Sequence, residues 1–61
     1  MPQDQCVEWW ITGVCLDEMG ESIGGNVILA GPLSSCSDAE IIRRGLAVRS
    51  EYTQVRIWRS V

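Results

Sequence analysis

Apolar residues fill both sides of a two-residue alternation in the first part of the chain. One alternating set is Val7, Trp9, Ile11, Gly13 and Cys15, and the other is Cys6, Glu8, Trp10, Thr12, Val14 and Leu16. Because β-branched and aromatic residues dominate and no helix start signal occurs, this pattern predicts a strand over residues 6–16. A strand that is apolar on both sides is usually central, so we place it in the middle of a sheet.

A second predicted strand follows a polar, glycine-containing turn at residues 17–21. This strand begins at Ser22 and ends at Leu29, because Ala30-Gly31-Pro32 is typical of a turn. The adjacent Gly24 and Gly25 weaken its start and are typical of a bulge. Together the two apolar runs and the turn between them predict a hairpin.

A helix is predicted after the hairpin. Ser37 and Glu40 have the spacing of a capping box, and apolar residues then recur at helical spacing to about residue 46 or 48. The apolar stripe of this helix consists of Ala39, Ile42 and Leu46, with Ile41 and Gly45 beside it. Arg43 and Arg44 fall on the other side, near the helix end where cations suit the macrodipole.

The final stretch, residues 52–61, alternates strictly and predicts a third strand. Val55 and Ile57 point to one side, and the other side carries Tyr52, Gln54, Arg56 and Trp58. The element order ββαβ predicts an α+β fold: a three-stranded antiparallel sheet in the order 2-1-3 with one helix packed on one face. We expect residues 1–61 to form one domain, with either Val27 or Ile28 joining Val55, Ile57 and the helix stripe in the core.

One helix cannot cover both faces of a sheet, so we expect Tyr52, Arg56 and Trp58 on the uncovered face. One of Trp9 and Trp10 joins them, and a one-residue slip in register would exchange the two rings. We favour Trp10 outside and Trp9 inside. Aromatic residues beside arginine are typical of a protein interface, although the same rings could instead pack on each other as a second, minimal core.

Composition excludes several classes of function. The chain has 61 residues, 46% of them hydrophobic and 21% charged, which is typical of a small folded domain with little room for an enclosed pocket. The cysteines are Cys6, Cys15 and Cys36, and no histidine occurs, so we predict reduced thiols and no metal or cofactor site. The polar start of the chain lacks the basic region of a signal peptide, and no apolar run could span a bilayer. We therefore expect a cytoplasmic protein.

Charge is divided unevenly along the chain. The net charge is −3, yet all five arginines lie after residue 40 and seven of the eight carboxylates lie before residue 41. Asp17, Glu18 and Glu21 are predicted to keep the hairpin tip solvated, which is not the water-poor pocket that acid or base catalysis needs. Their spacing does not match a calcium loop. No catalytic constellation is found, and we predict that the protein is not an enzyme.

Three kinds of binding stay open. The acidic half could occupy a basic groove that ordinarily holds nucleic acid, which makes Asp17, Glu18 and Glu21 candidate partner contacts together with the residues of the uncovered face. A homodimer could form through a sheet edge or the tryptophan face. Direct binding of single-stranded nucleic acid through stacked aromatics is disfavoured by the acidic net charge and the absence of lysine.

The hairpin, the capped helix preceded by serines and the final alternating strand Tyr52-Thr53-Gln54-Val55-Arg56-Ile57-Trp58-Arg59 together resemble small phage-encoded inhibitor proteins. Some type I anti-CRISPR proteins and a phage inhibitor of host RNA polymerase belong to this group. The resemblance covers residues 6–61 in element order. It implies a non-catalytic protein that docks on a large bacterial nucleic-acid enzyme. The five arginines depart from a uniformly acidic mimic of DNA.

Overall fold

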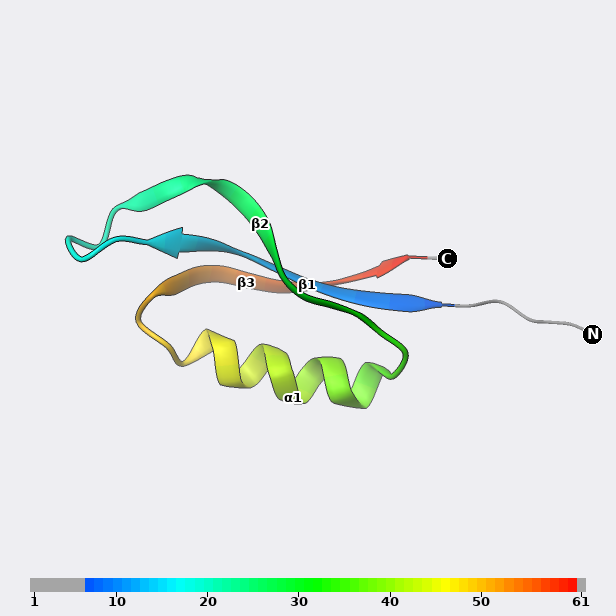
Figure 1. Cartoon of the computed structure of the whole chain (residues 1–61). Helices are drawn as coiled ribbons and strands as arrows, with labels where there is room; N and C mark the ends of the chain where they lie inside the picture. Colours follow the sequence, from blue (N-terminus) through cyan, green and yellow to red (C-terminus); the bar gives the residue numbers. More distant parts are fainter. Residues whose placement is uncertain (1–6, 61) are drawn as a thin grey trace, which may run out of the picture.

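The computed structural model describes residues 7–60 and has the predicted order of elements (Figure 1). These elements are β1 (Glu8–Leu16), β2 (Ser22–Leu33), α1 (Cys36–Ala47) and β3 (Tyr52–Ser60). The strands form one antiparallel sheet in the order β2-β1-β3. The predicted α+β class and strand order are therefore confirmed, with the doubly apolar strand in the centre. Cys6 and Val61, the predicted ends of the first and third strands, lie outside the described residues.

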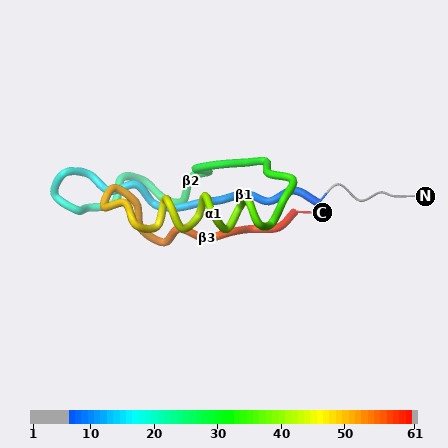
Figure 2. Tube along the Cα trace, turned by 90° about the horizontal axis from the view of Figure 1, so that it is seen from below, coloured from blue at the N-terminus to red at the C-terminus, as the bar shows by residue number. Residues whose placement is uncertain are grey.

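The helix covers one side of the sheet only. It packs mainly against β3, and more lightly against β1 and β2. Viewed from below, α1 runs along β1 and β3 (Figure 2), while the tip of the β1–β2 hairpin projects beyond the helix (Figure 1). The strand β2 is longer than predicted. It continues past Leu29 through the cis Gly31–Pro32 peptide and crosses toward the start of the helix. Much of β2 is therefore left without cover from α1.

The helix begins two residues earlier than the sequence pattern indicates. Ser35 is the N-cap residue: its backbone is extended, and its side-chain oxygen accepts a hydrogen bond from the backbone N–H of Asp38 at 3.3 Å. The predicted capping box of Ser37 and Glu40 is therefore wrong. Ser35 and Asp38 are three residues apart, as Ser37 and Glu40 are, and it is the first pair that caps the helix. The first turn therefore starts at Cys36 and already contains Ser37.

The fully packed interior is very small. Among the described residues, the buried apolar side chains are Ile11, Val14 and Ala39. Ile11 lies opposite Ile57 in the β1–β3 register and is completely inaccessible to solvent, as is Ala39 on the helix. Helix and sheet therefore meet around Ile11 and Ala39, with the predicted stripe residues Ile42 and Leu46 only half-buried.

The prediction that Val27 or Ile28 joins the core is wrong. Their side chains are 42% and 63% exposed, because β2 shifts its register against β1 and lies largely outside the area that α1 covers. Leu29 takes the inner position instead. A Cβ atom on Gly13 would lie 2.7 Å from Leu29 Cδ1 and 3.4 Å from Val55 Cγ2, so the missing side chain of Gly13 leaves the space that Leu29 occupies.

A bulge in β3 breaks the strict alternation predicted for this strand. Thr12 of β1 pairs with Arg56, whereas Cys15, three residues further on, pairs with Tyr52, four residues earlier. The extra residue lies near Gln54, whose φ of 55° is the left-handed conformation found at such bulges. Because Thr12 and Cys15 point to opposite sides of β1, Tyr52 does not share a side with Arg56 and Trp58. The prediction that they do is wrong.

Candidate protein-interaction surface

Cross-strand pairs assemble a group of large side chains on the side of the sheet opposite the helix. Trp10 pairs with Trp58, and Thr12 pairs with Arg56 on β3 and with Ile28 on β2. Paired residues point to the same side, as do Trp10 and Thr12, which are two residues apart. Their neighbour Ile11 points to the opposite side, toward α1. Val14, two residues beyond Thr12 on the same side, is buried, so the exposed group does not extend along β1 toward the hairpin tip. We call Trp10, Thr12, Ile28, Arg56 and Trp58 the open face.

Most of the open face is accessible to solvent. The side chain of Trp58 is 53% exposed, and those of Ile28 and Arg56 are also exposed. Trp10 is less exposed than these residues and is half-buried. The backbone of Gly31 lies against its ring, since a Cβ atom on Gly31 would come within 2.8 Å of Trp10 Cε3. The protein's own backbone therefore covers part of Trp10 but leaves Trp58 available.

A hydrogen bond fixes the exposed indole. Trp58 Nε1 donates to the hydroxyl oxygen of Thr12 at 2.6 Å. Indole has a single donor and no acceptor, so this bond satisfies its polar atom while its apolar body stays in solvent. A ring held in place before binding loses less side-chain entropy when a partner covers it. Trp58 thus has the exposure and the orientation expected of a binding anchor.

The register separates the two adjacent tryptophans of β1. Trp9 pairs with Arg59 and lies on the same side as Ile11, whereas Trp10 pairs with Trp58. The open face therefore contains Trp10, while Arg59 on β3 lies on the side opposite Arg56.

Thr12 and Ile28 are members of the open face that sequence reasoning missed. The sequence placed Ile28 among the core candidates, because consecutive apolar residues 27–29 leave the orientation of β2 open. Ile28 pairs with Thr12 because the register of β2 is shifted against β1. In the sequence, only the glycines at 24 and 25 indicate such shifts. Thr12 has no separate signal, since its role comes from its contact with Trp58.

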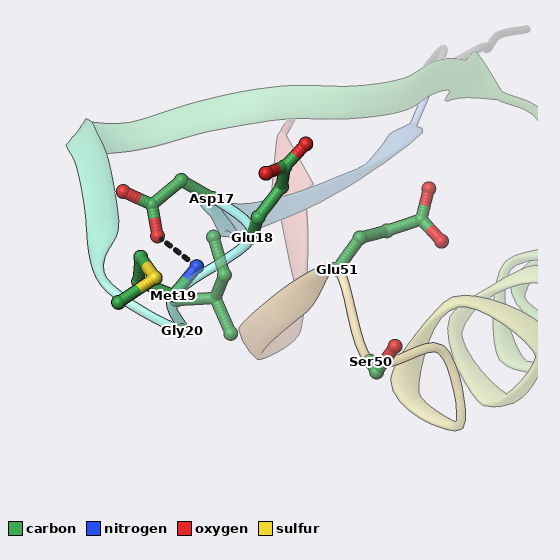
Figure 3. Close-up of a pocket in the computed structure, with 7 residues that line it drawn as sticks. Asp17, Glu18, Met19, Gly20, Ser50 and Glu51 are labelled. Carbon is green, nitrogen blue, oxygen red and sulfur yellow. Dashed lines mark hydrogen bonds between the residues drawn. The ribbon is translucent and has the colours of Figure 1, made fainter.

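The predicted acidic residues form a second, separate group at the hairpin tip. Asp17 Oδ1 accepts hydrogen bonds from the backbone N–H groups of Met19 and Glu21, both at 2.9 Å, and its own backbone N–H donates to the carbonyl of Glu21 at 2.8 Å. Asp17 therefore shapes the turn (Figure 3). Glu18 and Glu21 are exposed.

A shallow hollow lies between this tip and the turn that precedes β3 (Figure 3). Its lining residues are Leu16, Asp17, Glu18, Met19, Gly20, Ser50 and Glu51. The carboxylate of Glu51 accepts a hydrogen bond from Arg49 Nε at 3.1 Å, and this bond and the opposite charge raise the pKa of Arg49. The negative charge on this side of the hollow is thus partly neutralised within the chain.

The open face and the acidic tip do not form one site. Thr12 is the open-face residue of β1 that lies nearest to the tip, and it precedes Asp17 by five residues, which corresponds to about 17 Å of extended chain. The chain therefore offers two chemically different surfaces, one aromatic with an arginine and one acidic at the hairpin tip.

Within residues 7–60, no cluster of three or more candidate ligands could hold a metal ion. In the same part of the chain, no helix is long and apolar enough to cross a bilayer. Comparison of the chain with protein-family models, with curated proteins and with solved structures found no match. The geometry of the two surfaces is therefore the basis for a function.

Proposed function

We propose that this protein acts by binding another protein through the open face, without catalysing a reaction. The observation that carries the proposal is Trp58: a large aromatic side chain, more than half exposed, held by Thr12 and on the same side of β3 as Arg56. Tryptophan and arginine are the residue types most enriched among side chains that dominate binding energy. Trp58 and Arg56 lie together on the side of the sheet that α1 does not cover.

The balance of buried and exposed apolar side chains supports the same function. Three apolar residues are buried in the described part of the chain, whereas seven large ones are exposed. The exposed group comprises Met19, Ile23, Val27, Ile28, Ile41, Val48 and Trp58. Two of the seven, Ile28 and Trp58, lie on the open face, where exposed aromatic and aliphatic side chains are typical of a protein-interaction site.

The proposed partner is a large bacterial nucleic-acid-processing complex, and the proposed setting is the cytoplasm of a host cell in which a phage-encoded inhibitor acts. Two features support this finer proposal: the resemblance of residues 6–61 to small phage inhibitors, and the acidic tip. Surfaces that bind nucleic acid are basic, so Glu18 and Glu21 would be attracted to them while Arg56 and Trp58 make the anchoring contact.

Affinity capture from nuclease-treated bacterial lysates tests the proposal. The chain should recover components of nucleic-acid-processing machinery, and Arg56→Glu should abolish the recovery. Arg59→Glu is the matched control, because it makes the same charge change on the same strand but on the other side of the sheet.

Two results would contradict the proposal. Equal loss of capture with both variants would mean that net charge, and not the open face, drives the interaction. Capture that occurs only without nuclease treatment would favour the alternative of a base-stacking nucleic-acid binder.

A further inference from the structure

We propose that a second copy of this chain covers the open face when no other partner is bound, giving a dimer in which two sheets pack face to face. This dimer would use the same surface as the proposed function, and it rests on that function in taking the open face to be a binding surface. Charge around the tryptophan pair favours a second copy as the occupant, because the charge pattern of the face is complementary to itself.

The open face lies between two opposite charges. Arg56 is at one end, where it pairs with Thr12. Glu8 is at the other end, because it precedes Trp10 by two residues on the same side of β1. Both charged side chains are exposed, and neither forms an ion pair with a residue of the described part of the chain. Each charge is therefore available to a partner.

The two charges are equally far from the tryptophan pair. Along β1, Glu8 comes two residues before Trp10, and Thr12, which pairs with Arg56, comes two residues after it. Between these positions the β1–β3 register has no shift, and each step of two residues corresponds to about 7 Å of extended strand. A half-turn about an axis that crosses the strands at Trp10 therefore exchanges the acidic end of the face with the basic end.

A second copy in this orientation would meet the first with opposite charges. Glu8 of one copy would lie over Thr12 of the other, one strand spacing, or about 5 Å, to the side of Arg56. The arginine side chain can reach a carboxylate across this offset, and the twofold symmetry forms the contact twice. The two copies of Arg56 would lie at opposite ends of the contact. An axis along the strands would instead place Arg56 beside its own copy, so charge selects the antiparallel arrangement.

The exposed indole would be covered in the same arrangement. The ring of Trp58 leans toward Thr12, to which its Nε1 donates a hydrogen bond, and its side chain is 53% exposed. It would therefore lie beneath Glu8 and Trp10 of the other copy. Removing this apolar surface from water favours association. Because the indole N–H already has an acceptor, its burial leaves no unpaired donor.

Pairing through the sheet edges is a weaker alternative. At one edge, the register of β2 is shifted at three places and the strand contains Pro32. At the other edge, β3 has its bulge near Gln54. Bulges and proline prevent a sheet edge from pairing with another strand. The open face, by contrast, lies where β1 and β3 pair regularly.

The dimer and a complex with another protein would exclude each other, because both cover Trp58. The contact involves only one end of each sheet, so we expect a monomer–dimer equilibrium and not an obligate dimer. At low concentration the chain would be monomeric, with its open face free for the partner. At high concentration self-association would shield the exposed tryptophan from other contacts.

Sedimentation equilibrium from low micromolar to near-millimolar concentration tests the dimer through charge reversal. The unmodified chain should approach twice its monomer mass as concentration rises. Glu8→Arg and Arg56→Glu should each weaken association by about tenfold, because each brings like charges together. The double variant Glu8→Arg/Arg56→Glu should associate nearly as well as the unmodified chain, because it exchanges the two charges and restores both contacts.

Net charge is controlled in two ways. Arg59→Glu makes the same charge change as Arg56→Glu but on the other side of the sheet, and it should associate like the unmodified chain. Glu8→Arg makes the net charge less negative, so weaker association of this variant could not come from overall repulsion. Circular dichroism should show that each variant remains folded.

A strict monomer at every concentration would overturn the dimer, as would a double variant that associates no better than the single variants. Equal weakening by Arg59→Glu and Arg56→Glu would also overturn it. Partner capture is a separate measurement. A monomeric chain that still captures its partner would contradict only the dimer, and a dimeric chain that captures nothing would contradict only the proposed function.

Discussion

The indole N–H of Trp58 on β3 is 2.6 Å from the hydroxyl oxygen of Thr12 on β1, to which it donates a hydrogen bond. The bond runs diagonally across the open face, since Trp58 pairs with Trp10 and Thr12 pairs with Arg56. It connects two strands that are far apart in sequence and fixes the exposed ring at the same time. The fold thus determines the direction in which the proposed anchor points.

Thr12→Val should weaken partner capture while leaving the protein folded. Valine keeps the shape and strand propensity of threonine but removes the acceptor, so Trp58 loses its orientation. The lost hydrogen bond should lower the free energy of unfolding by about 1 kcal/mol or less, because water can replace the acceptor at an exposed ring. Capture and denaturant unfolding measure the two effects, and Thr12→Ser, which retains a hydroxyl, should preserve capture.

Gly31→Ala should be strongly destabilising. The φ of Gly31 is 127°, and an added Cβ would lie 2.8 Å from Trp10 Cε3 and 3.0 Å from the carbonyl oxygen of Trp9. Backbone strain and the steric clash together should lower the free energy of unfolding by roughly 2–4 kcal/mol, measured by urea denaturation.

Gly25→Ala is the control for this substitution. Gly25 is also in β2, but its φ is not positive and a Cβ there would have no neighbour within 4 Å. Its stability should be unchanged or slightly raised. Equal stability of Gly31→Ala and Gly25→Ala would contradict the close packing of the Gly31 backbone against Trp10.

Gln54→Gly should stabilise the protein. A side chain at a φ of 55° is strained, and glycine relieves that strain at some cost in chain entropy, so a gain of up to about 1 kcal/mol in unfolding free energy is expected. Gln54→Val should have the opposite effect, because a β-branched residue tolerates this conformation poorly. Thermal unfolding of both variants measures the difference, and a more stable valine variant would be inconsistent with the bulge.

Element order, strand order and the position of the helix could be predicted because they depend on coarse patterns. The doubly apolar run of β1 required a central strand, and the serine-rich segment followed by helical spacing required a capped helix. The sequence pattern places the N-cap two residues too late. Ser35 and Ser37 are each followed, three residues on, by an acidic residue, and only the backbone conformation distinguishes them.

The detailed composition of the open face could not be predicted, because it depends on bulges. One extra residue at Gln54 moves Tyr52 to the other side of β3, and the shifts in β2 bring Ile28 beside Thr12. Both changes follow from small backbone irregularities that alternation alone does not reveal. The distance between the acidic tip and Trp58 likewise became apparent only once the register was known.

Binding through Trp58 is tested by measuring partner capture and unfolding of Trp58→Ala side by side. Ile23→Ala is the control, because Ile23 is also exposed but pairs with Cys15, on the other side of β1. If Trp58 anchors the partner, Trp58→Ala loses capture and Ile23→Ala keeps it. The free energy of unfolding should change by no more than about 1 kcal/mol in either variant. Unfolding of Trp58→Ala would make the ring part of the core, and undiminished capture would mean that the partner binds elsewhere.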